Sequence, residues 1–328
     1  MTTKDISDSQ MVEKAQGARR PFAVLIAGPT ASGKTALAIN LAQKLGAVIL
    51  NGDSMQIYRE LNVLTARPSP AELAQADHRL FGHISGNEPY NVMRWLEEIS
   101  GELREAVAAQ RPVVIVGGTG LYFKAALEGI SLMPDIDAEV RAYWRRFAQQ
   151  AEEGALHAAL ASRDAQMATR LHAEDTQRLV RALEVYDSTG KSLSYWQQER
   201  STPILRPGDV CKLVLMPERR ILHDRIHQRF DMMMQNGALE EAVALAGRDY
   251  GADMPVMKAI GVPQLVAASN GEISLEAAIE KCKTETRRYA KRQSTFFRGQ
   301  LSDWPLVDPL QADALRETSE RICQGFMQ

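Results

Sequence analysis

The stretch from Gly28 to Thr35 reads GPTASGKT and fits the phosphate-loop pattern G-x-x-x-x-G-K-[ST] at every position. It follows an apolar run, 22–27, that is typical of a buried strand, and precedes 36–45, where apolar residues recur with a helical period. In such a loop the glycines allow a tight turn, backbone N–H groups face phosphate oxygens, and the lysine adds positive charge. The order strand, loop, helix therefore predicts an α/β fold with a phosphate site.

Composition narrows the class of protein. The chain has 328 residues, 45% apolar and 24% charged, which is ordinary for a soluble globular protein. Its net charge of −2 gives no overall attraction to nucleic acid, so a polyanion site must come from local segregation of charge. Three widely spaced cysteines predict neither disulfides nor a zinc site. Since no apolar run approaches about 18 residues and residues 1–20 lack the apolar centre of a signal peptide, we expect a cytoplasmic protein.

Short apolar runs and helical patterns outline the domains. Further strand-like runs occur at 47–50, 112–116 and 210–216, with a helical pattern at 92–109 between the first two, as in a parallel sheet with crossover helices. The interval 134–200 is helical in pattern throughout, which is too long for one crossover. We expect a disordered lead at 1–20, a P-loop NTPase-like α/β core with C-terminal helices at 21–133 and 201–310, an inserted all-helical lobe at 134–200, and a tail helix at 311–328.

An acid and a glycine-rich loop follow two of these runs. Asp53 comes after the run 47–50, and parallel strands end at a common edge, so its carboxylate should lie near the phosphate loop. It could act as a general base or metal ligand, or only cap the next helix. Gly117–Gly120 follows 112–116 and has no acid where ATPases and GTPases place an aspartate for Mg²⁺. This favours a different phosphate chemistry, unless another carboxylate holds the metal; an ordinary tight turn is the alternative.

Basic residues gather in helical segments. Arg178 and Arg181 share one face of a predicted helix, and so do Arg225 and Arg229 of another, which suits phosphate binding in the first pair and a clamp on a leaving phosphate in the second. The segment 281–298 has seven basic residues and one acid, with three aromatic residues between them. That composition favours single-stranded RNA binding, and a solvated basic face is the alternative.

Five segments then occur in an order that is specific to one family. They read GPTASGKT at 28–35, DSMQIY at 53–58, GGTGLY at 117–122, QRLVRALE at 177–184 and RRYAKRQ at 287–293. Together they resemble the bacterial tRNA dimethylallyltransferases over nearly the whole span 22–309. The resemblance implies transfer of a dimethylallyl group from dimethylallyl diphosphate to N6 of adenosine at tRNA position 37, in the anticodon stem-loop, with release of diphosphate. We expect a monomer that uses Mg²⁺.

The resemblance also implies roles for individual residues. Catalysis would rest on Asp53 as the base for the amino group of a flipped-out adenine, on Thr35 as an Mg²⁺ ligand, and on Arg225 and Arg229 at the leaving diphosphate. The donor diphosphate would lie on Gly28, Pro29, Thr30, Ala31, Ser32, Gly33, Lys34 and Thr35. The positions implied to contact tRNA are Asp53, Ser54, Met55, Gln56, Thr119, Arg141, Gln177, Arg178, Leu179, Val180 and Arg181.

The sequence departs from the family pattern in two places. Residues 64–68 read LTARP where the family usually has GTAKP, and 77–80 read DHRL where it has a second histidine. The first keeps a cation but replaces the point charge of lysine with the planar guanidinium of arginine.

Three alternative functions stay open: a prenyltransferase for free adenine nucleotides, a P-loop kinase of a small metabolite, and an RNA-binding protein with a relic loop. The helical interval and basic segment favour tRNA.

Overall fold

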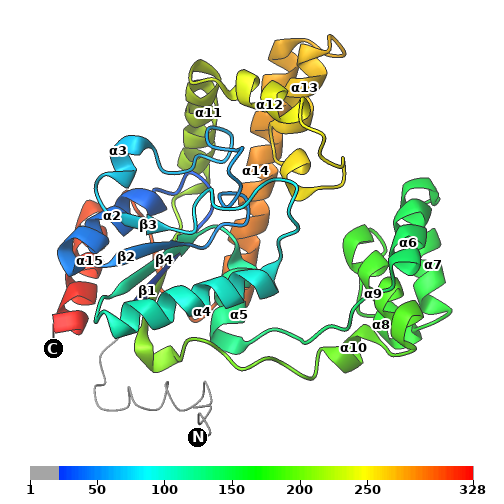
Figure 1. Cartoon of the computed structure of the whole chain (residues 1–328), viewed down its shortest axis with the longest axis horizontal. Coiled ribbons are helices and arrows are strands. Elements are labelled where there is room, and N and C mark those ends of the chain that lie inside the picture. The colour runs from blue at the N-terminus through cyan, green and yellow to red at the C-terminus, as the bar shows by residue number, and fades with distance from the viewer. Residues whose placement is uncertain (1–21, 328) are drawn as a thin grey trace, which may run out of the picture. The chain divides into compact units, whose positions relative to one another are not determined.

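The computed structural model describes residues 22–327, and its central element is a six-stranded sheet in which all paired neighbours are parallel (Figure 1). The predicted lead at 1–20 lies outside the described residues. The strand order is β3-β2-β4-β1-β5-β6. The strands are β1 (Ala23–Ala27), β2 (Val48–Asn51), β3 (Asp77–Arg79), β4 (Val113–Gly117), β5 (Val210–Leu215) and β6 (Leu306–Val307).

The register of the central strands brings their carboxyl ends level. Ala27 at the end of β1 pairs with Gly117 of β4 on one side and with Val214 of β5 on the other. Asn51 at the end of β2 pairs with Val116. The loops that follow these four strands therefore share one edge of the sheet, which is where ligands bind in open α/β folds.

The α/β prediction is confirmed, and the four apolar runs form the four central strands. The two edge strands β3 and β6 were not predicted. They have three and two residues, and β3 consists of Asp77, His78 and Arg79, so neither carries the apolar run that marks a buried strand.

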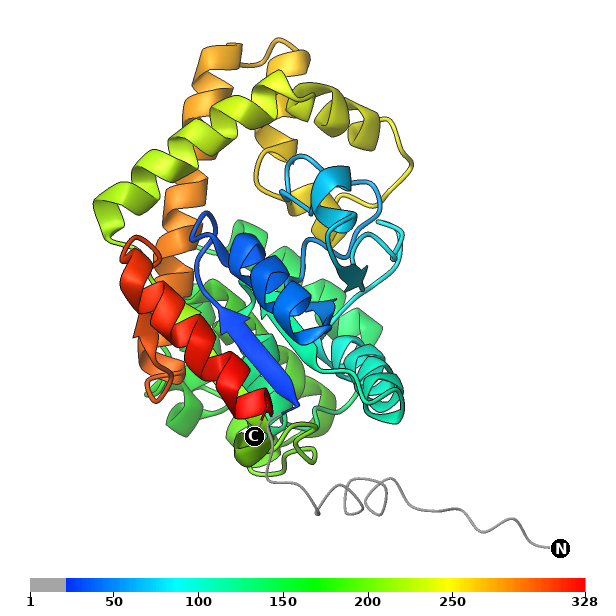
Figure 2. The same ribbon diagram turned by 90° about the vertical axis from the view of Figure 1, so that its left-hand side faces the viewer.

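Helices cover both faces of the sheet. On one face, α2 (Lys34–Leu45) and α15 (Ala312–Met327) bury an apolar cluster with β1, β2, β4 and β5 (Figure 2). On the other lie α4 (Val92–Ala108) and α5 (Gly120–Glu128), joined by stacked rings of Trp95 and Tyr122 with centroids 4.5 Å apart. The buried indole of Trp95 donates to the carbonyl of Asn51 (2.9 Å), which fixes α4 to the end of β2.

A further group of helices in the same unit stands at the carboxyl edge of the sheet (Figure 1). Phe230, Ala242, Leu265 and Cys282 belong to the apolar cluster that joins its members. The members are α11 (Arg219–Gln235), α12 (Ala238–Ala246), α13 (Val262–Ser269) and α14 (Leu275–Gln300). The short α3 (Pro70–Leu73) lies in the loop before β3 and begins with a capping box at Ser69.

Residues 128–203 form a second compact unit. Its core is a separate apolar cluster around the fully buried Trp144, Leu160 and Leu183. Its helices are α6 (Ala138–Gln150), α7 (Ala155–Ala161), α8 (Ala165–Ala168), α9 (Thr176–Thr189) and α10 (Leu193–Trp196). The unit is wider than the predicted helical interval 134–200 because the two connecting segments pair through a bridge between Ser131 and Arg200.

In the described part of the chain, every helix is too short or too polar to span a lipid bilayer.

Candidate active site

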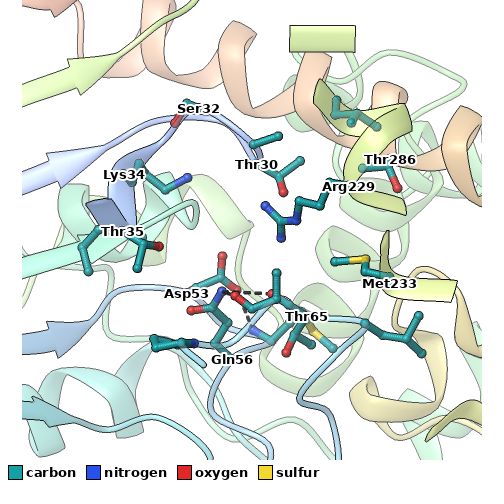
Figure 3. A pocket seen from close by; sticks show the side chains of 18 of the residues that line it. Thr30, Ser32, Lys34, Thr35, Asp53, Gln56, Thr65, Arg229, Met233 and Thr286 are labelled. Atoms are coloured by element: carbon teal, nitrogen blue, oxygen red, sulfur yellow. Dashed lines mark hydrogen bonds between the residues drawn. The ribbon is translucent and has the colours of Figure 1, made fainter. Parts of the chain in front are cut away.

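A pocket of about 730 Å³ opens at the carboxyl edge of the sheet (Figure 3). Its walls come from the phosphate loop, the segment 53–56, the loop 64–68, α11 and α14. The structure thus brings together Thr30–Thr35, Asp53–Gln56, Arg225 and Arg229, which lie far apart in the sequence. Gly28 and Pro29 do not line this pocket, and they belong to the loop that forms its wall.

The phosphate loop adopts a conformation that its sequence makes possible. At Gly28, a Cβ atom would lie 2.6 Å from the carbonyl oxygen of Leu215 at the end of β5, so a side chain is excluded. Gly33 has φ +92° and Ala31 has φ +62°. For alanine this left-handed conformation costs on the order of 1 kcal/mol, and such strain is concentrated at ligand-binding loops. The helix α2 begins at Lys34, so its N-terminus, with unpaired N–H groups, completes an anion cradle.

Lys34 and Arg229 make the pocket electropositive. Burial lowers the pKa of Lys34 to about 7, with Asp53 acting to raise it and Arg229 to lower it. Burial also lowers the pKa of Arg229, against the opposing charge of Asp53. The Lys34 ammonium donates to the carbonyl of Pro29 (2.7 Å). Two cations that share one carboxylate leave an excess of positive charge, which suits a multiply charged anion such as diphosphate.

Asp53 is held by a network around the buried Asn51. The Asn51 side chain donates to the carbonyls of Asp53 (2.9 Å) and Leu80 (3.1 Å) and accepts from the N–H of Asp53 (2.9 Å). Asp53 Oδ1 accepts from the N–H of Met55 (2.9 Å). Among the described residues, Asp53 Oδ2 has no hydrogen-bond donor, so it is the oxygen that can receive a proton in the pocket. A carboxylate held in this way suits a general base.

The residues next to Asp53 are fixed to neighbouring loops. Ser54 donates its N–H to the hydroxyl of Thr119 (2.9 Å), which in turn donates to the Ser54 hydroxyl (3.2 Å). Gln56 donates from its amide nitrogen to the carbonyls of Thr65 (2.9 Å) and Ala66 (3.0 Å). Both bonds use the NH₂ group, so the Gln56 carbonyl oxygen is left to accept from a ligand. Thr119 thus supports the site from behind and does not line the pocket.

The pocket residues fit a magnesium ion that arrives with a phosphate ligand. Among the described residues, no group of three His, Cys, Asp or Glu side chains could hold a metal alone. Mg²⁺ commonly takes one or two protein oxygens and completes its shell with water and phosphate oxygens. The Thr35 hydroxyl, in the pocket wall, is such an oxygen. The buried Ser32 hydroxyl in the same loop has no hydrogen-bond partner in the described structure, as expected where a ligand is the missing partner.

The residues expected to contact tRNA from the helical interval lie in the second unit, on α6 and α9. Arg141, Gln177 and Arg178 are exposed, while Val180 and Arg181 are half-buried. Leu179 is a correction. Its side chain is fully buried in the core of this unit, so it supports α9 and offers no surface to a ligand.

Glu241 was missed from the sequence, and two residues of the basic segment 281–298 have a place in the pocket that the sequence did not predict. Glu241 of α12 accepts backbone N–H groups of Asn62 (2.6 Å), Val63 (2.8 Å) and Leu64 (2.8 Å), and so holds the loop that forms one pocket wall. Tyr289 and Arg292 of α14 also line the pocket. Sequence patterns gave no signal for Glu241, because nothing local marks a carboxylate whose partners lie some 180 positions earlier.

Two aromatic residues of the basic segment, Phe296 and Phe297, pack against other parts of the protein. Phe297 is fully buried, and Phe296 packs against Gly120, where a Cβ would lie 2.3 Å from its ring. The basic residues are partly paired: Lys283 binds Asp231 (2.8 Å) and Arg288 binds Glu285 (2.6 Å). The interpretation of 281–298 as a stacking platform is therefore wrong for Phe297, whose ring is fully buried.

The two departures from the family pattern are accounted for by local contacts. Arg67 donates to the carbonyl of Tyr58 (3.2 Å) and the side chain of Asn62 (3.3 Å) and does not line the pocket. Arg79 binds Asp77 (3.3 Å) together with two glutamates of α4. The guanidinium of Arg67 thus stabilises the loop 64–68. Arg79 and Asp77 belong to an ion-pair cluster around β3.

Comparison with known proteins places these features in one family. The family model described as "IPP transferase" matches residues 56–300, and "Isopentenyl transferase" matches residues 22–83. This chain belongs to the IPP transferase family. The tRNA dimethylallyltransferase of Azorhizobium caulinodans is 47% identical to this IPP transferase, over 88% of this chain and 92% of the relative. That of Chelativorans sp. is 49% identical over 86% of this chain and 97% of the relative.

Solved structures show the same fold for this IPP transferase. The full-length tRNA isopentenylpyrophosphate transferase of Bacillus halodurans superposes with a TM-score of 0.67 at 30% identity, covering 93% of this chain and 96% of that one. A eukaryotic dimethylallyltransferase acting on tRNA gives a TM-score of 0.70 at 27% identity, covering 87% of this chain and 73% of that one. The resemblance noted from the five sequence segments is thereby confirmed.

Proposed function

We propose that this IPP transferase moves a dimethylallyl group from dimethylallyl diphosphate to N6 of adenosine 37 in the anticodon stem-loop of tRNA, and that it acts as a monomer. The observation that carries the proposal is the shared pocket of the phosphate loop, Asp53 and Arg229. The names of the relatives, which are tRNA dimethylallyltransferases, support the choice of substrates.

The proposed reaction is a displacement at the first carbon of the prenyl group. The N6 nitrogen forms a bond to this carbon, the bond from carbon to the diphosphate oxygen breaks, and diphosphate leaves with the electron pair. Lys34, Arg229 and the loop N–H groups stabilise the charge that develops on the leaving oxygen. Asp53 Oδ2 accepts the proton that N6 loses. Mg²⁺, held by the Thr35 hydroxyl, would supply additional neutralisation of the diphosphate.

The structure disfavours a P-loop kinase or ATPase. β4 ends in Gly117 and continues into Gly118 and Thr119, so the strand that neighbours the phosphate loop carries no acid for a nucleotide-bound metal. A prenyltransferase for free adenine nucleotides shares the pocket chemistry, but it has no use for a separate helical unit with exposed arginines.

Incorporation of labelled prenyl groups tests the proposal. We expect labelled dimethylallyl diphosphate to modify an unmodified anticodon stem-loop that has adenosine at position 37, and not a stem-loop with guanosine there. Free AMP is added as a competing acceptor of the prenyl group. ATP is added as the substrate that a kinase or ATPase would hydrolyse. Preferential labelling of AMP would favour the nucleotide prenyltransferase, and steady ATP hydrolysis without labelling would favour the kinase.

The arginines of α9 provide a test of tRNA binding that does not depend on the chemistry. We expect Arg178→Ala combined with Arg181→Ala to weaken tRNA binding and to reduce the slope of log affinity against log salt by about 1 for each phosphate that the variant no longer binds. Filter binding at several salt concentrations measures this slope. The variant Arg170→Ala, which removes another exposed arginine of the same unit, is the control. A slope equal to that of the wild type in the double variant would exclude α9 from the interface.

A further inference from the structure

One buried glutamine of α14 hydrogen-bonds both to the phosphate loop and to the loop after β4. Gln293 is 6% exposed and lies on the helix that carries the basic segment. Its side-chain oxygen accepts the N–H of Thr30 in the phosphate loop (2.9 Å). Its side-chain nitrogen donates to the carbonyl of Gly118 in the loop after β4 (2.9 Å). Since β1 and β4 are neighbours in the sheet, a single amide bridges the loops that follow them.

The bond to Thr30 fixes one peptide group of the phosphate loop. The N–H of Thr30 and the carbonyl of Pro29 belong to the same peptide unit. Gln293 binds the first and Lys34 binds the second (2.7 Å), so both polar groups of this peptide are satisfied by side chains. The Pro29 carbonyl also accepts the N–H of Ser32 (3.3 Å), whereas Gln293 is the partner of the Thr30 N–H.

The bond to Gly118 connects the same amide to the catalytic base. A Cβ atom at Gly118 would lie 2.3 Å from Gln293 Nε2 and 3.1 Å from Asp53 Oδ2, so the amide and the carboxylate flank this glycine. Thr119, the next residue, holds Ser54 and thereby the segment of Asp53. The Gln293 amide therefore links the phosphate loop to the loop beside Asp53. Its oxygen accepts from the Thr30 N–H, and its nitrogen donates to the Gly118 carbonyl.

We propose that Gln293 is a positioning residue that aligns the phosphate loop with the Asp53 segment. The donor diphosphate and the acceptor nitrogen are thereby held at the distance and orientation that the reaction needs. This inference rests on the proposed function for the identity of the donor. It requires an amide at this position, because only an amide offers one acceptor and one donor at the end of a side chain of this length. An apolar side chain of the same shape would fill the space and leave both loops unlinked.

Kinetics of Gln293→Met and Gln293→Glu test the inference. The methionine keeps the volume and loses both bonds, while the glutamate keeps the acceptor for Thr30 and places a carboxylate against the Gly118 carbonyl. We expect the donor KM to rise roughly tenfold in each, the effect of about one net hydrogen bond, with the tRNA KM changed less than about twofold. A merely structural role would instead reduce the active fraction and the unfolding midpoint and leave the donor KM unchanged. Gln300→Met, at an exposed glutamine of the same helix, is the control.

Binding of inorganic diphosphate with Mg²⁺, measured by calorimetry, separates this inference from the proposed function. If the wild type transfers no prenyl group but Gln293→Met weakens diphosphate binding about tenfold, the function fails and the positioning role stands. If the wild type is active and Gln293→Met matches it in donor KM and diphosphate affinity, the positioning role is wrong. Should both variants misfold, hydrogen exchange in the ligand-free wild type decides: we expect the Thr30 N–H to be protected, and free exchange would overturn the inference.

Discussion

Replacing Asp53 with asparagine is expected to lower the rate of prenyl transfer by about 10²- to 10⁴-fold, the usual contribution of a positioned general base. The side-chain oxygen of asparagine can still accept from the N–H of Met55, so the local turn is kept and only the proton acceptor is lost. Single-turnover measurements with both substrates saturating report the chemical step. Donor binding should not weaken, because the change removes a negative charge from the neighbourhood of Lys34 and Arg229.

Asp249→Asn is the matched control, since Asp249 is exposed and does not line the pocket. A rate in Asp53→Asn within about threefold of the wild type would show that another group or water takes the proton, as the expected loss is far larger. A loss of donor affinity together with a normal chemical rate would instead assign Asp53 to binding.

Replacing Lys34 with methionine is expected to raise the donor KM and to lower kcat by about 10²- to 10³-fold, the loss typical of removing a preorganised group that faces developing negative charge. The wild type should also show a pH dependence that the variant lacks. Burial lowers the pKa of Lys34 from 10.5 to about 7 in the ligand-free pocket, so above pH 7 the amine is mainly neutral before the donor binds. An anionic donor favours the charged amine, so binding takes up a proton and the affinity falls as the pH rises above 7.

The sign of the stability effect follows from the same shift. Between pH 7 and 10.5 the unfolded chain binds more protons at Lys34 than the folded chain does, so this group makes the ligand-free protein more stable as pH rises through that window.

Calorimetry in buffers of different ionisation enthalpy measures the proton uptake on donor binding. Lys44→Met, at an exposed lysine on α2, is the control. Equal proton uptake in the wild type and Lys34→Met would remove Lys34 from the donor site.

The sequence was sufficient for those features that local patterns encode. The phosphate loop, Asp53 at the end of β2 and the four apolar strands each carry a signal within a few residues, because motif spacing and hydrophobic period are local properties. The helix predicted to carry Arg178 and Arg181 is α9, and its end is also local: Gly190 caps it at φ +68°.

Features that depend on tertiary contacts could not be predicted. The edge strands β3 and β6 exist only through pairing with a neighbour, and Glu241 and Gln293 are ordinary polar residues of helices until the fold sets backbone groups opposite them. The same reason explains the error at Phe297. Aromatic residues interleaved with basic ones have the same composition whether they face solvent or the core, and burial decides between the two.

The place of β5 in the sheet has a consequence for the synthesis of the chain. β1 pairs with β4, completed at residue 117, and with β5, which begins at residue 210. The unit 128–203 has a core of its own and leaves the ribosome before β5 does, so it can form while the sheet is still missing an inner strand. Arg229 and Gln293 emerge later still. A nascent or prematurely terminated chain therefore has the phosphate motif but an incomplete pocket. The chain can bind the donor only near the end of translation.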